Sequence, residues 1–138
     1  MDKINTEHLQ KCIDTLAKSF VYLQRSKEDS IEYEMFRNSL VKGFEITLEQ
    51  SGKLLRKKIT PYFATKKEVD QLPFKEVFRH ANKHSLLDEA DVERWFLYRD
   101  NRNDTAHDYG VAFAEETLKL AETLIEDAQK IKDMIDND

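Results

Sequence analysis

Apolar residues recur every three or four positions along most of the chain, a spacing typical of amphipathic helices. Over residues 6–25 they form a single stripe consisting of Leu9, Ile13, Leu16, Phe20 and Leu23. Asn5 or Thr6 can cap the start of this helix, because each side chain carries an oxygen that accepts a hydrogen bond from a free backbone N–H. The polar stretch 26–30 is predicted to be a short loop.

The next periodic segment is the longest and runs from about Ile31 to Lys58. Asp29 with Glu32 resembles a capping box at its start. Its main apolar positions are Phe36, Leu40, Phe44, Leu48, Leu55 and Ile59. Gly43 lies inside the segment, which indicates either a close approach of another helix or simple tolerance of glycine. The helix is expected to end at Thr60, because the proline that follows disfavours the α conformation there.

Residues 62–72 show no periodicity and are predicted to form a loop. Pro73 suits the first turn of a short helix over 74–84, where its missing N–H is not needed. His80 and His84 lie one turn apart on this helix, a spacing that can bind a metal. No carboxylate accompanies them and no H-E-x-x-H pattern occurs, so ordinary surface histidines are the favoured interpretation.

Two more helices follow, over about 89–104 and 111–136. Asp88 is placed to cap the first of them, whose three–four–three stripe consists of Val92, Trp95, Arg99 and Arg102. That stripe is expected to face inward, so Arg102 must be paired or line a cleft. The last helix has near-heptad apolar positions and an acidic outer face. Its apolar positions are Val111, Ala114, Leu118, Ala121, Ile125, Ala128 and Ile135.

The fold class follows from this pattern. Five helical segments without a convincing strand predict an all-α fold, an antiparallel up-and-down bundle of four long helices and one short helix. The length of 138 residues suits one domain over 1–138, large enough to bury a core without disulfides or metals. The scarcity of Gly (3) and Pro (2) favours long uninterrupted helices.

Composition narrows the class of function. The single cysteine, Cys12, excludes an internal disulfide and a Cys-rich zinc site, and points to a reducing, cytoplasmic setting. No apolar run approaches 18 residues, so neither a membrane span nor a signal peptide is expected. The formal charge of −5 argues neither for nor against nucleic acid, because a local basic patch is sufficient for binding.

One such patch is a basic run around the end of the second helix: Lys53, Arg56, Lys57, Lys58, Lys66 and Lys67. The favoured interpretation is a solvated helix end whose cations suit the negative C-terminal dipole. The alternative is a surface that binds RNA phosphates or an acidic partner.

The octapeptide 102–109 joins the last two long helices and is more varied than most helix connections. Arg102 and His107 are five residues apart, so a straight helix would hold their side chains about 140° apart. The intervening Asn-Asp-Thr favours caps and turns over helix interior. We therefore expect the helix to stop near Asp104 and His107 to swing toward Arg102.

An arginine beside a histidine suits phosphodiester chemistry. Arginine offers a fixed fork of donors to phosphate oxygens, and histidine takes or gives a proton near neutral pH. Metal-free RNA cleavage needs a base, an acid and a cation, and one chain supplies one such histidine, so a two-fold homodimer would complete the site. Alternatively, Arg102 pairs with Asp100, Asp104 or Asp108 to tie the bend, and His107 merely packs.

Arg102-x4-His107-x-Tyr109 resembles the R-x4-H-x-Y motif of HEPN-domain proteins of the HepT type, which include the nucleotidyltransferase substrate-binding proteins. The similarity spans roughly residues 9–135. It also includes the segments 36–40, 44–49 and 72–79, with Trp95 ahead of Arg102-Asn103. The chain departs from the family at Gly52-Lys53, where the family often has Trp-Lys.

The resemblance implies a HEPN-like helical homodimer with the motif in the interfacial cleft, and a minimal nucleotidyltransferase as antitoxin partner. It implies ribonuclease activity in which Arg102 stabilises phosphate charge and His107 acts as the acid–base or 2′-hydroxyl-orienting group. Asn103 and Asp104 would shape the bend. Tyr109 would be adenylylated by the partner, and the added AMP would repel an RNA phosphate. A half-buried aromatic at a helix start is the plain alternative for Tyr109.

Three functions follow as hypotheses. The leading one is a metal-independent endoribonuclease, the toxin of a toxin–antitoxin module, neutralised by its nucleotidyltransferase partner. The second is a non-catalytic subunit that presents a nucleotide or other substrate to that partner. The third is a structural bundle that binds a partner through its acidic last helix. No cofactor and no metal are expected.

Overall fold

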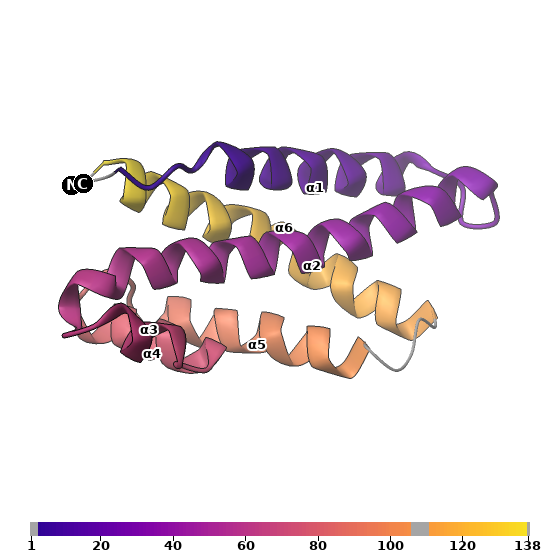
Figure 1. Cartoon of the computed structure of the whole chain (residues 1–138). Coiled ribbons are helices and arrows are strands. Elements are labelled where there is room, and N and C mark those ends of the chain that lie inside the picture. Colours follow the sequence, from indigo (N-terminus) through magenta and orange to yellow (C-terminus); the bar gives the residue numbers. More distant parts are fainter. Residues whose placement is uncertain (1–2, 106–110, 138) are drawn as a thin grey trace.

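The computed structural model describes residues 3–105 and 111–137, and within these the side chains of 102–105 and 111–114 are not described. This part of the chain is helical throughout, without strands, and forms an elongated bundle (Figure 1). Its elements are α1 (Glu7–Arg25), α2 (Ile31–Ile59), a 3-10 turn η1 (Thr60–Tyr62), α3 (Lys66–Asp70), α4 (Phe74–Lys83), α5 (Glu89–Thr105) and α6 (Val111–Asp136). The predicted all-α bundle is confirmed.

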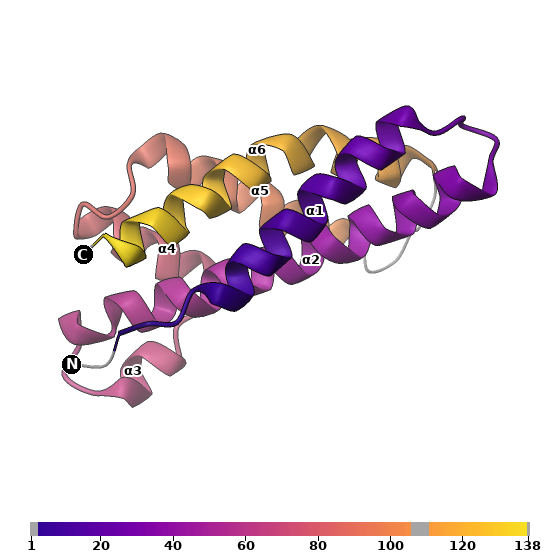
Figure 2. The same ribbon diagram turned by 90° about the horizontal axis from the view of Figure 1, so that it is seen from above.

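Four long helices run alternately up and down the bundle, as Figures 1 and 2 show. The long helix α2 is central because it packs against every other element, and α6 packs against α1, α2 and α5. The short α4 packs against α2 and α5 at one end of the bundle. Both chain termini lie at that same end (Figure 1), where the Thr6 hydroxyl donates to Asp136 Oδ1 at 2.7 Å.

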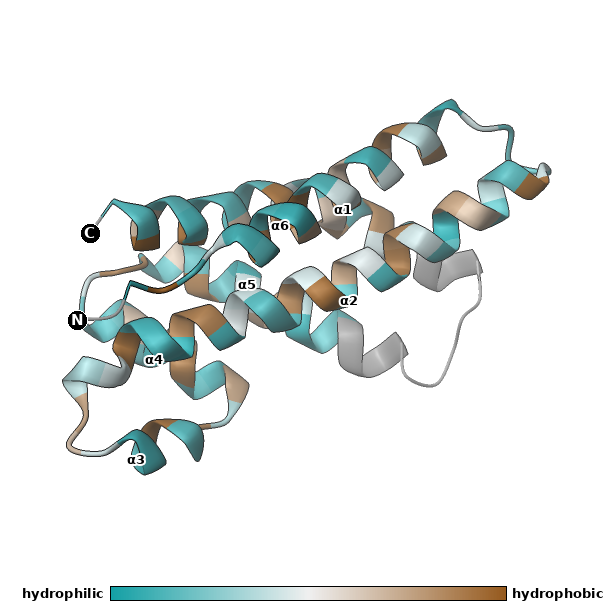
Figure 3. Ribbon diagram, turned by 45° about the horizontal axis from the view of Figure 1, so that its top comes forward, coloured by the Kyte–Doolittle hydropathy of each residue, from teal (hydrophilic) through white to brown (hydrophobic). Residues whose placement is uncertain are grey.

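The apolar stripes predicted from the sequence form the core. Figure 3 shows hydrophobic positions on the inward faces of the helices and hydrophilic ones outside. Leu9, Leu16, Leu40, Leu48, Leu55 and Leu124 are fully buried. An aromatic chain links three helices: Phe74, Phe78, Trp95, Tyr98 and Phe44 follow one another with ring centroids 4.8, 5.0, 5.3 and 6.1 Å apart. This chain joins α4 and α5 to α2.

One helix cap differs from the prediction, and two agree with it. The cap of α2 is Ser30 rather than Asp29, because the Ser30 hydroxyl oxygen accepts from Tyr33 N–H at 3.0 Å. The start of α1 is capped by Asn5, whose side-chain oxygen accepts from Glu7 N–H at 2.9 Å. The predicted Asp88 cap of α5 is also confirmed by the bond from Asp91 N–H at 2.8 Å.

The predicted loop over 62–72 is wrong, because it contains the one-turn helix α3. Thr65 caps α3 by accepting from Glu68 N–H at 3.2 Å, and buried Val69 anchors it to the core. The Thr65-x-x-Glu68 spacing is a capping-box pattern, but five residues are too few to show helical periodicity.

Arg56 fastens α3 to α2. Its guanidinium donates to the carbonyl oxygens of Val69 and, at 2.9 Å, Leu72. One member of the predicted basic run is therefore a structural residue rather than a solvated cation.

Two glycines in α2 allow close contacts of different kinds. A Cβ built at Gly43 would lie 3.5–3.7 Å from Leu16 of α1, an ordinary contact distance, so of the two alternatives the structure favours simple tolerance of glycine at this position. A Cβ built at Gly52 would lie 2.6 Å from the Phe74 ring, so that ring occupies the space of a side chain at position 52. This accounts for the glycine where the family often has tryptophan.

The two glycines give a matched pair of substitutions. Gly43→Ala is expected to leave stability unchanged or raise it by up to about 1 kcal/mol, because alanine favours a helix interior. Gly52→Ala is expected to lower it by about 1–2 kcal/mol, because the Phe74 ring is held between Phe78 and Arg99 and must shift. Urea unfolding measures both. Equal stability of the two variants would contradict the packing at Gly52.

Candidate functional site

The sequence places the Arg102–Tyr109 motif at the junction of α5 and α6. The backbone is helical through Arg102, Asn103 and Asp104, since α5 spans Glu89–Thr105, and α6 begins at Val111. His107 and Tyr109 lie outside the described residues, as does the predicted swing of His107 toward Arg102. Both therefore stay predictions.

The inward face of α5 differs from the predicted stripe. Val92 and Trp95 are buried as expected, but the face continues through Tyr98 and Asn101 rather than Arg99. Arg99 is half-buried, with its guanidinium 4.8 Å from the centre of the Phe74 ring. A cation over an aromatic face is favourable without full burial.

A buried carboxylate ties α5 to α6. Asp127 of α6, with a side chain only 4% exposed, accepts two hydrogen bonds from Arg94 of α5, at 2.9 and 3.0 Å. The Tyr98 hydroxyl donates to the same carboxylate, and Arg94 also bridges to Asp91. A buried carboxylate is tolerated when it is paired and its oxygens accept hydrogen bonds, as they do here.

The ionisation states in this cluster follow from its geometry. Burial, and then the hydrogen bond to Asp127, raises the pKa of Tyr98 well above its ordinary value. The hydrogen bond to Asp127 raises the pKa of Arg94 too. At neutral pH the Asp127 side chain therefore accepts hydrogen bonds from an arginine cation and a neutral tyrosine.

A second polar contact lies one turn closer to the motif. Asn101 Nδ2 donates to Thr117 Oγ1 of α6 at 3.1 Å, and both residues are buried. Asn101 immediately precedes Arg102, so this contact fixes the last turns of α5 against α6. The sequence signal for both contacts is polar residues at inward positions of α5, spaced by four and three: Arg94, Tyr98 and Asn101.

Other polar residues singled out in the sequence make structural contacts. The His84 ring stacks on Tyr62 with centroids 3.8 Å apart, and the His80 ring meets Phe63 edge-on at 4.9 Å. Within the described ranges, no three His, Cys, Asp or Glu residues are grouped so as to hold a metal ion. Asp100, considered as a partner of Arg102, forms an ion pair with Lys75 at 2.8 Å.

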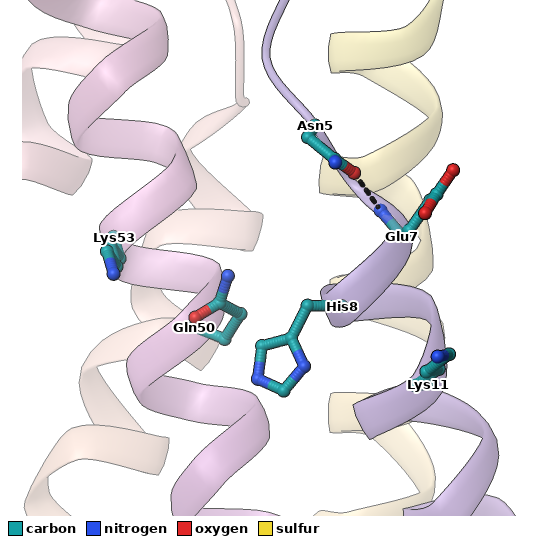
Figure 4. Close-up of a pocket in the computed structure, with 6 residues that line it drawn as sticks. All are labelled: Asn5, Glu7, His8, Lys11, Gln50 and Lys53. Atoms are coloured by element: carbon teal, nitrogen blue, oxygen red, sulfur yellow. Dashed lines mark hydrogen bonds between the residues drawn. The ribbon is translucent and has the colours of Figure 1, made fainter.

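A shallow groove of about 500 Å³ lies between the start of α1 and the second half of α2 (Figure 4). Its lining is polar throughout and consists of Asn5, Glu7, His8, Lys11, Gln50 and Lys53. None of these residues belongs to the motif. Two of them were identified in the sequence, Lys53 as part of the basic run and Asn5 as a possible helix cap. The groove is a polar, open hollow in which Glu7 offsets part of the positive charge.

The described helices include none that is long and apolar enough to cross a membrane.

Comparison with known proteins places the chain in one family. The family model described as "Nucleotidyltransferase substrate binding protein like" matches residues 5–137. A curated relative from Haemophilus influenzae, "Probable ribonuclease HepT", is 25% identical over 112 residues, covering 78% of this chain and 75% of the relative. A solved structure from the same organism, HI0074, described as the fold of a substrate binding domain of a nucleotidyltransferase, matches with a TM-score of 0.81 and 18% identity. That match covers 96% of this chain and 99% of the other.

The helical bundle is therefore of the nucleotidyltransferase substrate-binding class. The chain belongs to this family, in its HepT-type, HEPN-domain branch. The resemblance inferred from the motif and the second-helix pattern is confirmed.

The Asp127 cluster predicts an alkaline dependence of stability. Below pH 10, Tyr98→Phe is expected to lower the free energy of unfolding by about 1.5–3 kcal/mol, because it removes a hydrogen bond to a charged group. Unfolded tyrosine ionises near pH 10, whereas folded Tyr98 stays protonated. The difference in free energy of unfolding between the parent and Tyr98→Phe is therefore fully present below pH 10. Above pH 10 it decreases by up to about 1.4 kcal/mol per pH unit.

Urea titrations of the parent and the Tyr98→Phe variant at pH 8, 10 and 11 measure this difference. Tyr22→Phe is the matched control, because Tyr22 is 45% exposed. A difference between parent and Tyr98→Phe that stays constant to pH 11 would contradict the buried hydrogen bond.

Proposed function

We propose that this protein is a metal-independent endoribonuclease, the toxin of a two-component module whose antitoxin is a minimal nucleotidyltransferase. The observation that carries the proposal is an R-x4-H-x-Y motif at the α5–α6 junction in a chain of the HepT-type family. The curated relative named as a probable ribonuclease supports the reaction class. The family description supports a nucleotidyltransferase partner.

The proposed reaction uses the RNA's own 2′-hydroxyl as nucleophile. A base removes the 2′-hydroxyl proton, the 2′-oxygen bonds to phosphorus, and the bond to the 5′-oxygen breaks as an acid protonates that oxygen. The products are a 2′,3′-cyclic phosphate and a 5′-hydroxyl. His107 serves as base or acid, or orients the 2′-hydroxyl, and Arg102 stabilises the negative charge that develops on the phosphate.

A homodimer supplies the second acid–base group. Because each chain carries one motif histidine, a two-fold axis through the α5–α6 junction brings two Arg102–His107 pairs into one cleft. Within each chain, the Arg94–Asp127 and Asn101–Thr117 contacts hold α5 against α6 and so support the position of Arg102. Asn103 and Asp104 shape the last turn of α5.

The nucleotidyltransferase partner would silence the site through Tyr109. Transfer of AMP to the Tyr109 oxygen releases pyrophosphate from ATP and places a phosphate diester beside Arg102. The added negative charge and bulk would then exclude an RNA phosphate from the cleft. The motif tyrosine, two residues after His107, supports this regulation.

Substitution of the two motif residues tests the catalytic assignment. Arg102→Ala and His107→Ala are each expected to lower RNA cleavage at least 100-fold while the helical circular dichroism and thermal midpoint stay near the parent values. His8→Ala is the matched control, because His8 is an exposed histidine on α1. Cleavage by both motif variants at the parent rate would show that these residues are not the site.

Co-expression with the cognate nucleotidyltransferase tests the regulation. The intact mass of the chain is expected to rise by whole AMP units, and Tyr109→Phe is expected to abolish the increase. Tyr22→Phe, at an exposed tyrosine of α1, is expected to leave it unchanged. An inactive complex that contains an unmodified chain would instead mean inhibition by occlusion of the cleft.

A further inference from the structure

Positive charge is concentrated in one continuous part of the sequence. Residues 53–84 contain nine lysines and arginines and three acidic residues, a net charge of +6 in a chain whose total is −5. The remaining residues therefore carry −11. These 32 residues form the end of α2, η1, α3 and α4, which lie together at one end of the bundle (Figures 1 and 2). This region is therefore a local concentration of positive charge in a chain that is acidic overall.

Part of this charge is already engaged. Arg56 holds backbone carbonyls, Lys75 pairs with Asp100, and Arg79 pairs with Glu76. By contrast Lys57, Lys66, Lys67 and Lys83 are exposed and form no ion pair with any described residue. Such cations are available to an anionic ligand.

An exposed aromatic pair is formed by two residues that are close to these lysines in the sequence. Tyr62 and His84 are stacked, with centroids 3.8 Å apart and rings 4° from parallel, and Tyr62 is still 49% exposed. Tyr62 comes five residues after Lys57 and four before Lys66, and His84 directly follows Lys83. The stack is held in place because η1 and the end of α4 are both fixed to α2.

We propose that this end of the bundle, through the Tyr62–His84 stack and Lys57, Lys66, Lys67 and Lys83, is a binding site for single-stranded RNA. A base stacks on the exposed part of Tyr62 and extends the existing ring pair. The lysines contact the flanking phosphates. An exposed aromatic surrounded by cations is the combination that binds single strands without reading their sequence. A duplex fits less well, because its bases are already stacked on one another.

The site is separate from the Arg102–Tyr109 motif. Phe44 of α2 contacts Tyr98 of α5. From Phe44, α2 continues for 15 residues to its end at Ile59. From Tyr98, α5 continues for seven residues to its end at Thr105, in the opposite direction along the bundle. At about 1.5 Å per residue, the two ends are roughly 30 Å apart along the bundle. An RNA chain long enough to span that distance would be bound at the basic end and cleaved at the motif. The cleavage part of this inference rests on the proposed function.

Fluorescence anisotropy with a labelled 12-nucleotide single-stranded RNA tests the site. The full-length chain is used with His107→Ala as background, so that the probe stays intact. Tyr62→Ala is expected to weaken binding about 5- to 100-fold, and Tyr62→Phe to bind like the background. Lys66→Gln with Lys67→Gln is expected to reduce the slope of log K against log salt by about 1.4, or 0.7 per lost phosphate contact.

Tyr22→Ala and the pair Lys18→Gln with Lys27→Gln are the matched controls, because these exposed residues lie outside the 53–84 region. They are expected to leave affinity unchanged. The proposal is overturned if Tyr62→Ala binds as tightly as Tyr62→Phe, if the control lysines matter as much as Lys66 and Lys67, or if a duplex binds as well. The lysine pair tests the site even if Tyr62→Ala unfolds. Cleavage by the His107→Ala background would refute the catalytic assignment alone, and binding would then be measured with a 2′-O-methyl RNA, which lacks the nucleophilic hydroxyl.

Discussion

The carboxylate of Asp127 is the constraint on which the arrangement of α5 and α6 depends. Burying a charge is tolerable only with close partners, and removing one typically costs several kcal/mol. Arg94 and Tyr98, one turn apart on α5, satisfy this carboxylate from the neighbouring helix. Apolar contacts alone would let two helices slide or rotate, whereas this cluster and the Asn101–Thr117 bond permit one register. This register sets where the end of α5, at which the motif begins, lies relative to α6.

At the opposite end of the bundle, the packing of α4 depends on the absence of a side chain at Gly52. Gly52 leaves space for the Phe74 ring, which begins the aromatic chain through Phe78 and Trp95 and so fixes α4. Arg56 fixes α3 through backbone carbonyls. Together these contacts fix the short helices α3 and α4 against the end of α2, where the basic residues lie. The basic surface thus lies at one end of the bundle, and the junction of α5 and α6 lies at the other.

The long helices could be predicted from the sequence because each buries one regular apolar stripe, as Leu9, Ile13 and Leu16 do in α1. The short α3 could not be found that way, since its stability comes from one buried valine, a threonine cap and Arg56 rather than from periodicity. The predicted inward face of α5 is wrong at Arg99, because polar residues, Tyr98 and Asn101, occupy the positions that face α6. For the candidate site, the motif itself identified the family. The contacts of Asp127 and Asn101 depend on helix register, which a single sequence does not specify.

The family, the bundle and the motif together lead to one chemical claim, that this chain cleaves RNA with its own side chains and the substrate's 2′-hydroxyl. The most direct measurement is digestion of single-stranded RNA by the purified chain alone, in the presence of EDTA, with the product ends identified by mass spectrometry. The account predicts fragments that end in 2′,3′-cyclic phosphates and 5′-hydroxyls, formed at the same rate with and without the chelator. RNA that stays intact while the chain binds nucleotides tightly would contradict it and would indicate a substrate-binding subunit instead.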